Sequence, residues 1–307
     1  MIITALGLLV PYFLFSKASV FFGFALLGIG NTIVQVSANP LLVDVVPSDK
    51  KSSFLSFSQF IKAIGSMVAP FVAALFADQF GDWKLMFLAF GIVSVLSVIW
   101  LGFTKIEETK NTEKRATIGS SLGLLGNRYV ALMVLGIFLV VGIDVGINAV
   151  SGQFLLNKFD SAQEFAEKGR SVYFFGKMLG TFAGALMLAI LSSRKFLLWT
   201  SVLGLASILA LIVVPTPITA MAVIFIIGLG VANIFPLIFS LTVGKYPLRA
   251  NEISGLMIMA VSGGAAIPPL IGLLTDSFGL TAGMFVLVVC AAYLLVLALS
   301  NLKKSEK

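Results

Sequence analysis

Three charged residues lie inside long apolar stretches of this chain, where a charge is costly unless it meets a partner, water or a ligand. Lys62 lies roughly 15 Å along its stretch if that stretch is helical, which is near the middle of a bilayer. Asp144 and Lys177 lie on two successive stretches that would run antiparallel, so the two side chains could pair. Such a pair either only locks two helices together or takes part in binding a solute or an ion, and the sequence favours neither.

Polar side chains recur every three to four residues along four of the apolar stretches, so each set faces one side of a helix. The sets are Asn31, Gln35 and Asn39; Ser52, Ser56, Gln59, Lys62 and Ser66; Asp144, Asn148 and Ser151; and Asn233 and Ser240. Isolated Ser and Thr residues mostly join helices, at about 0.6 kcal/mol per hydrogen bond. For stripes of amides with an embedded lysine we favour the lining of an aqueous cavity. The candidate binding or coupling residues are Asn31, Gln35, Asn39, Gln59, Lys62, Asp144, Asn148, Lys177 and Asn233.

Small residues and rings accompany these stripes. Gly176, Gly180 and Gly184 recur every four residues beside Lys177, which predicts a helix face that another helix can approach closely. Tyr173 is one of the few aromatic residues next to a polar stripe, and its ring is a weak candidate for stacking on a ligand.

The apolar stretches themselves define the class of protein. The chain is 59% hydrophobic and 11% charged, with a mean hydropathy of +1.06, which is more apolar surface than a soluble core can hide. Stretches long enough to cross a ~30 Å hydrocarbon layer run from 18–46, 52–77, 83–104, 128–157, 170–192, 195–214, 217–243, 252–275 and 280–301. A tenth, 1–15, is too short for a full crossing. We therefore expect an all-α membrane protein.

Other residue types exclude several kinds of chemistry. The chain has no histidine and a single cysteine, Cys290, so we expect no metal site, no histidine proton relay and no intrachain disulfide. No nucleophile with a base partner and no phosphate-binding loop is found, so we expect neither an enzyme nor a cofactor.

The net charge of +7 is distributed as in a membrane protein rather than a nucleic-acid binder. Of the 21 Lys and Arg residues, 14 fall on one side of the predicted membrane and 5 on the other. By the positive-inside rule the richer side is cytoplasmic, which predicts a multi-pass inner-membrane protein with a cytoplasmic C-terminus. The richer side carries Lys50, Lys51, Lys105, Lys110, Lys114, Arg115, Arg128, Arg194, Lys195, Lys245, Arg249, Lys303, Lys304 and Lys307.

The chain also contains an internal repeat. Residues 59–87 recur as 257–285, with Gly65 matching Gly263 and Gly81 matching Gly279. The offset between the two copies, 198 residues (from 59 to 257), is too long for a solenoid unit, so the duplicated unit is a half made of several helices. We expect an N-terminal bundle at 1–104, a cytoplasmic linker at 105–127 and a six-helix bundle at 128–307. The first half then lacks the counterparts of the first two helices of the second half.

Four strings resemble one group of transporters. They are NTIVQVSANP at 31–40, GIDVGIN at 142–148, GLGVANIFPLIFSL at 228–241 and SGLMIMAVSGGAAIPPLIGLLTD at 254–276. They are similar to helices of the fucose permease and glucose/galactose transporter family of the major facilitator superfamily, which are proton-coupled sugar symporters. This resemblance implies the superfamily fold, with ten of its usual twelve transmembrane helices in two pseudo-symmetric halves.

Four positions depart from the pattern of that family. Gln35 stands where those transporters have a carboxylate implicated in proton coupling, and an amide cannot titrate. Lys62 replaces a neutral amide, Lys177 an Arg and Asp144 a Glu. The added lysine suggests an anionic sugar such as a uronate or a sialic acid.

The resemblance implies a secondary active transporter that imports a sugar or sugar-like solute by alternating access, coupled to protons or another cation. Its expected partners are that small solute and the lipid bilayer, with no nucleic acid, and the chain would act as a monomer. Two alternatives are a nontransporting truncated remnant or membrane sensor, and a facilitator for a different small solute.

Overall fold

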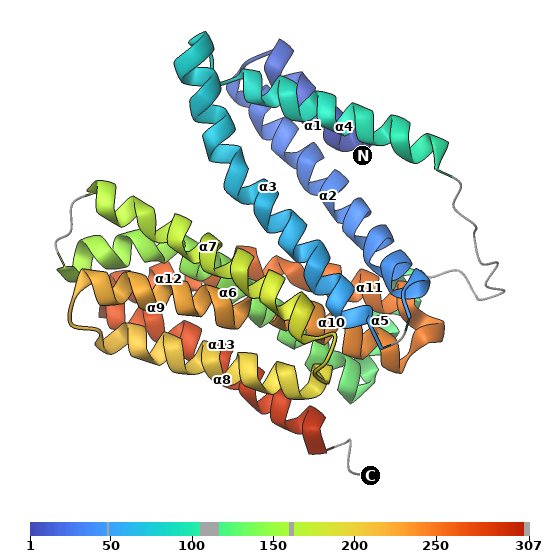
Figure 1. Ribbon diagram of the computed structural model, residues 1–307, viewed down its shortest axis with the longest axis vertical. Coiled ribbons are helices and arrows are strands. Elements are labelled where there is room, and N and C mark those ends of the chain that lie inside the picture. The colour runs from blue at the N-terminus through green and yellow to red at the C-terminus, as the bar shows by residue number, and fades with distance from the viewer. Residues whose placement is uncertain (48, 105–116, 160–162, 304–307) are drawn as a thin grey trace. The chain divides into compact units, whose positions relative to one another are not determined.

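The computed structural model describes residues 1–47, 49–104, 117–159 and 163–303, and within these ranges every regular element is a helix (Figure 1). The α-helices are α1 (Ile2–Phe13), α2 (Lys17–Val45), α3 (Lys51–Phe80), α4 (Leu85–Phe103), α5 (Ile118–Gly123), α6 (Arg128–Phe159), α7 (Gln163–Met187), α8 (Ser193–Val213), α9 (Pro217–Val231), α10 (Ile234–Lys245), α11 (Ala250–Met259), α12 (Gly263–Phe278) and α13 (Leu280–Lys303). Three short 3-10 helices are η1 (Leu124–Gly126), η2 (Pro247–Arg249) and η3 (Ala260–Ser262).

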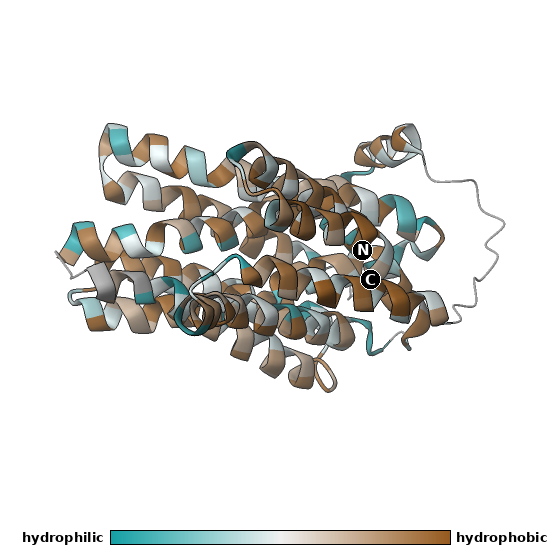
Figure 2. Ribbon diagram, turned by 90° about the horizontal axis from the view of Figure 1, so that it is seen from above, coloured by the Kyte–Doolittle hydropathy of each residue, from teal (hydrophilic) through white to brown (hydrophobic). Residues whose placement is uncertain are grey.

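Most of these helices have the length and composition of membrane spans. Among the described residues, eight segments are long and apolar enough to cross a bilayer, counting α9 with α10 and α11 with α12 as one segment each. The shorter α1 and the more polar α7 complete the ten predicted helices. Figure 2 shows apolar residues along most of each helix. The predicted all-α membrane class is confirmed.

The chain divides into two compact units, each of which is described by itself. The first comprises residues 1–39 and 66–115, and the second comprises residues 40–65 and 116–307. The predicted domain boundaries stay a prediction, and residues 105–116 of the predicted linker lie outside the described residues. The rest of that linker, from 118 to 126, is helical and belongs to the second unit.

In the first unit, α1 lies against both α2 and α4. A Cβ atom placed on Gly23 of α2 would meet the carbonyl oxygen of Gly7 at 2.6 Å, and one placed on Gly91 of α4 would meet the side chain of Leu9. Glycines on α2 and α4 therefore allow α1 to approach closely.

In the second unit, the long helices α6, α7, α8, α9, α12 and α13 run side by side as a bundle (Figure 1). α6 packs against α7, α12 and α13 and buries the apolar residues of its inner faces, among them Ile137, Ile143 and Ile147. A helix surrounded by other helices has little contact with lipid, so it can carry polar side chains at lower cost.

Two spans of this unit are interrupted. α9 ends at Val231 and α10 begins at Ile234, because Pro236 has no N–H to donate to the carbonyl oxygen of Ala232. The second interruption is the 3-10 helix η3 between α11 and α12, ahead of Pro268 and Pro269. Each interruption replaces regular α-helix inside a span.

The predicted repeat is visible in the backbone. Gly81 after α3 and Gly279 after α12 both adopt positive φ angles, 68° and 89°. Their N–H groups donate to equivalent carbonyl oxygens, those of Ala77 at 3.0 Å and Thr275 at 2.9 Å. Only glycine adopts this conformation without steric cost, so the matched glycines end matched helices. The backbones of the two copies differ at one place: α3 is continuous, whereas its counterpart is interrupted by η3 between α11 and α12.

The predicted close approach at the α7 glycines is also confirmed, and the partner is α9. A Cβ atom on Gly180 would lie 2.9 Å from the carbonyl oxygen of Leu229, and one on Gly176 would collide with the backbone of Phe225. From the other side, a Cβ atom on Gly228 would lie 2.8 Å from the backbone nitrogen of Lys177. The two backbones are therefore in direct contact.

This contact predicts that Gly176→Ala destabilises the protein. The added methyl group would meet backbone that cannot rotate away, so we expect a loss of about 1–3 kcal/mol. Thermal unfolding of the purified protein in detergent would show a lower midpoint. The matched control is Gly272→Ala in α12, where nothing lies within 4 Å of the new atom and helix propensity favours alanine. Equal midpoints for the two variants would contradict the close approach.

Candidate functional site

The centre of the candidate site is a carboxylate that meets two donors. Lys177 of α7 contacts Asp144 of α6, with 2.6 Å between Nζ and Oδ2. The hydroxyl of Tyr173 donates to Oδ1 of the same carboxylate, also at 2.6 Å. The predicted pairing of Asp144 and Lys177 is thus confirmed. Each of the two charged side chains is about a quarter exposed, at 25% and 23%, so the pair is reachable rather than sealed in the core.

The helices α7 and α9 hold these donors in place. Tyr173 and Lys177 lie one turn apart on α7 and therefore share a face. Gly228 of α9 packs against the backbone of both residues. Tyr173 is fully buried and has few alternative positions for its ring. Sequence reasoning noted Tyr173 only as a ring and missed its hydroxyl; the one-turn spacing from Lys177 was the available signal.

Helix α3 brings Lys62 to the same cluster. Within the second unit, the hydroxyl of Ser53 donates to the carbonyl oxygen of Ala185 at 2.5 Å, and the rings of Phe60 and Phe182 lie 5.0 Å apart. The N-terminal part of α3 therefore follows α7. Further along it, Lys62 is exposed, and the charges of both Lys177 and Asp144 act on it. Two lysines and one aspartate thus share this region.

Two predicted amides lie in the same unit. Asn148 follows Asp144 by one turn of α6, and its Oδ1 is buried without a hydrogen-bond partner among the described residues. Asn233, at the break between α9 and α10, is only 1% exposed and donates from Nδ2 to the carbonyl oxygen of Gly180 at 2.7 Å. Its Oδ1 is likewise without a partner within the described part of the chain. Because a buried oxygen without a donor is costly, both amides can accept a hydrogen bond from water or a ligand.

The remaining predicted residues are not joined to the cluster by any described contact. Gln59 lies on α3 of the second unit and is half-buried. The amide stripe of α2 belongs to the first unit, where Asn31 lines a pocket of about 210 Å³ together with Thr4 and Ser97. Gln35 is half-buried and Asn39 is buried. Their part in a shared cavity stays a prediction.

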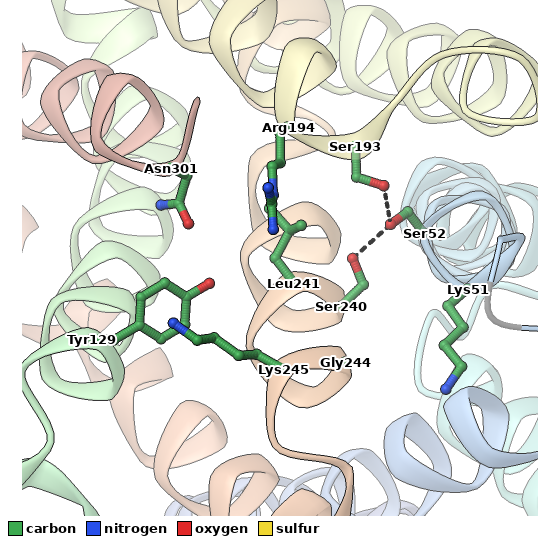
Figure 3. Close-up of a pocket in the computed structure, with 10 residues that line it drawn as sticks. All are labelled: Lys51, Ser52, Tyr129, Ser193, Arg194, Ser240, Leu241, Gly244, Lys245 and Asn301. Carbon is green, nitrogen blue, oxygen red and sulfur yellow. Dashed lines mark hydrogen bonds between the residues drawn. The ribbon is translucent and has the colours of Figure 1, made fainter. Parts of the chain in front are cut away.

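A second polar site lies at the start of α3, where Ser52 and Ser240 of the predicted stripes meet each other and Ser193; their meeting was not predicted. The hydroxyl of Ser52 is hydrogen-bonded to that of Ser193 of α8 at 2.7 Å and to that of Ser240 of α10 at 2.6 Å (Figure 3). We call these three residues the serine cluster. They lie at the edge of a cavity of about 510 Å³ that Arg194 and Lys245 also line.

Comparisons with known proteins agree with this architecture. The sequence profile of the Major Facilitator Superfamily matches residues 1–266. A protein named glucose/galactose transporter of Brucella abortus biovar 1 (strain 9-941) is 26% identical in an alignment of 313 positions, gaps included, that covers 96% of this chain and 75% of that protein. A protein named glucose/mannose transporter GlcP of Bacillus subtilis (strain 168) is 26% identical over 280 residues, which cover 85% of this chain and 67% of that protein.

A solved structure has the same fold. The crystal structure of FucP, a transporter of the same superfamily in the outward conformation, superposes with a TM-score of 0.85 over 97% of this chain and 80% of that one, at 16% identity. The profile match covers most of the sequence, and the helices have the length and composition of a multi-pass membrane protein. The chain belongs to the Major Facilitator Superfamily, a family of membrane transporters and not of enzymes.

Proposed function

We propose that this protein is a secondary active transporter of the cell inner membrane that imports a sugar or sugar-like solute by alternating access, in symport with protons or another cation. The observation that carries the proposal is the contact of Asp144 with Lys177 and Tyr173 inside an otherwise apolar bundle. Charged groups within membrane spans mark solute and ion pathways. Relatives that are named as glucose/galactose and glucose/mannose transporters support a sugar as the solute.

The charge of the cluster favours an anionic sugar. Lys62 and Lys177 place two positive charges near Asp144. A solute carboxylate would be attracted to these cations, and Lys62 is the exposed one.

Asp144 is the group through which protons would couple to transport. While it is ionised it holds Lys177 and accepts from Tyr173. A proton on Asp144 would remove the attraction for Lys177, whose ammonium would then be available to the solute. In this proposal the carboxylate that takes part in coupling lies on α6, because the α2 position that carries a carboxylate in fucose-type symporters is Gln35 here.

The serine cluster is the proposed closure on the cytoplasmic side. It joins the start of α3 to α8 and α10 through short hydrogen bonds. The basic residues around it, Lys51, Arg194 and Lys245, are all among those that loop charges assign to the cytoplasm. Alternating access requires that such contacts form and break as the two halves rock about the solute.

Uptake of labelled solutes by cells that produce the full-length protein tests the function. We expect saturable uptake of a sugar that a protonophore abolishes, with uronates or sialic acid preferred to neutral hexoses. Lys62→Gln should lower uptake of the anionic sugar at least tenfold, whereas Lys158→Gln, which changes a lysine at the far end of α6, should leave it unchanged. If no sugar is taken up, the proposal of sugar transport is wrong. If Lys62→Gln leaves uptake unaltered, only the proposed preference for anionic sugars is wrong.

A double variant tests whether the Asp144–Lys177 pair only stabilises the fold or also couples protons to transport. Asp144→Asn with Lys177→Gln removes both charges, so neither is left without its partner, and we expect the unfolding midpoint to stay within a few degrees of the parent protein. Each single variant should be less stable than the double. If the pair couples protons to transport, the double variant no longer accumulates solute against its gradient. Normal accumulation by the double variant would show that the pair only joins α6 to α7.

A reversible cross-link tests the closure. In a Cys290→Ala background, the Ser52→Cys and Ser240→Cys pair replaces two hydroxyl oxygens that lie 2.6 Å apart, so an oxidant should link them. We expect uptake to fall more than tenfold on oxidation and to recover with a reductant. Each single cysteine variant serves as the control. A complete cross-link that leaves uptake intact would rule out the opening of this contact during transport.

A further inference from the structure

The cavity beside the serine cluster carries an excess of positive charge. Its lining includes Lys51, Arg194 and Lys245, and the other polar groups on its wall are neutral (Figure 3). Within the described residues, no carboxylate lines this cavity and none forms an ion pair with these three cations. Like charges that share a cavity of about 510 Å³ repel one another, so an anion placed among them would lower the electrostatic energy.

Two of the cations lie on the side of the cavity that Tyr129 lines. Nζ of Lys245 lies 3.8 Å from the centre of the Tyr129 ring, and the charge of Arg194 also acts on Tyr129. In Figure 3, the side chains of Arg194 and Lys245 reach into the space beside Tyr129, while Lys51 extends away from them. Lys245 is partly balanced by the ring and by the C-terminal end of α10. Among the described residues, no ring contact or ion pair compensates Arg194, so it is the principal candidate to hold an anion.

The start of α8 adds a second attraction for negative charge. Ser193 and Arg194 form its first turn and both line the cavity. The N-cap residue Ser192 makes no side-chain hydrogen bond to this turn. The N-terminus of a helix of this length carries a partial positive charge and free N–H groups, which favour an anion such as phosphate. The guanidinium and the helix end therefore act on the same cavity.

We propose that this cavity binds a phosphate group, with Arg194 as its main ligand and Lys245 as a secondary one. A guanidinium can donate two parallel hydrogen bonds to phosphate, and lysine supplies a point charge. The group could belong to a free phosphorylated solute or to the head of an anionic phospholipid, since basic pockets between transmembrane helices bind such heads. The inference does not depend on what the protein transports.

Binding measurements on the purified full-length protein in a neutral detergent test the proposal, with inorganic phosphate as the probe. Calorimetry against chloride at equal ionic strength should show one saturable site. Arg194→Gln should weaken binding at least tenfold and Lys245→Gln less strongly. Lys195→Gln is the matched control, because it removes the same charge from the next residue of α8, which is exposed and outside the cavity. We expect that variant to bind as the parent protein does.

A second measurement separates the two sources of phosphate. In nanodiscs that contain phosphatidylglycerol and phosphatidylcholine, native mass spectrometry would count retained anionic lipid. Retention that Arg194→Gln abolishes and Lys195→Gln preserves would assign the site to a lipid head, even if inorganic phosphate does not bind. Binding of inorganic phosphate without lipid retention would assign it to a soluble solute. If Arg194→Gln and Lys195→Gln behave alike in both measurements, the proposal is wrong.

Discussion

The contact between the backbones of α7 and α9 is the constraint on which the candidate site depends. Gly176 and Gly180 of α7 and Gly228 of α9 leave no room for a side chain, so the helices meet along their main chains. In lipid there is little hydrophobic gain from bringing two helices together, and close packing of this kind supplies much of the attraction. It also fixes the rotation of α7, and with it the direction of Tyr173 and Lys177.

The fixed rotation explains how charges are tolerated at this depth. Asp144 receives a donor on each of its oxygens, from a lysine and from a buried hydroxyl, so its negative charge is offset without bulk water. The partial exposure of the pair keeps it within reach of a solute. A sealed pair would only add rigidity, whereas a pair at the edge of accessible space can exchange its partner for a ligand.

The sequence predicted the features that follow from local spacing. The helical class, the glycine face of α7 and the pairing of Asp144 with Lys177 all follow from apolar length, from four-residue periodicity and from antiparallel neighbours. The end of α9 was not predicted, although Pro236 lies four residues after Ala232 and removes that hydrogen bond. The cavity at Arg194 could not be predicted, because the packing of α3, α8 and α10, which are distant in the sequence, brings its lining residues together.

The continuity of α3 has a mechanical consequence. Ser52 and Lys62 lie on one uninterrupted helix, roughly 15 Å apart. No break separates them, so in the proposed transport cycle a displacement of Ser52 away from α8 and α10 would also displace or rotate Lys62. Loss of the solute from Lys62 and opening of the serine cluster would then belong to one motion of α3, without any relay of side chains between them.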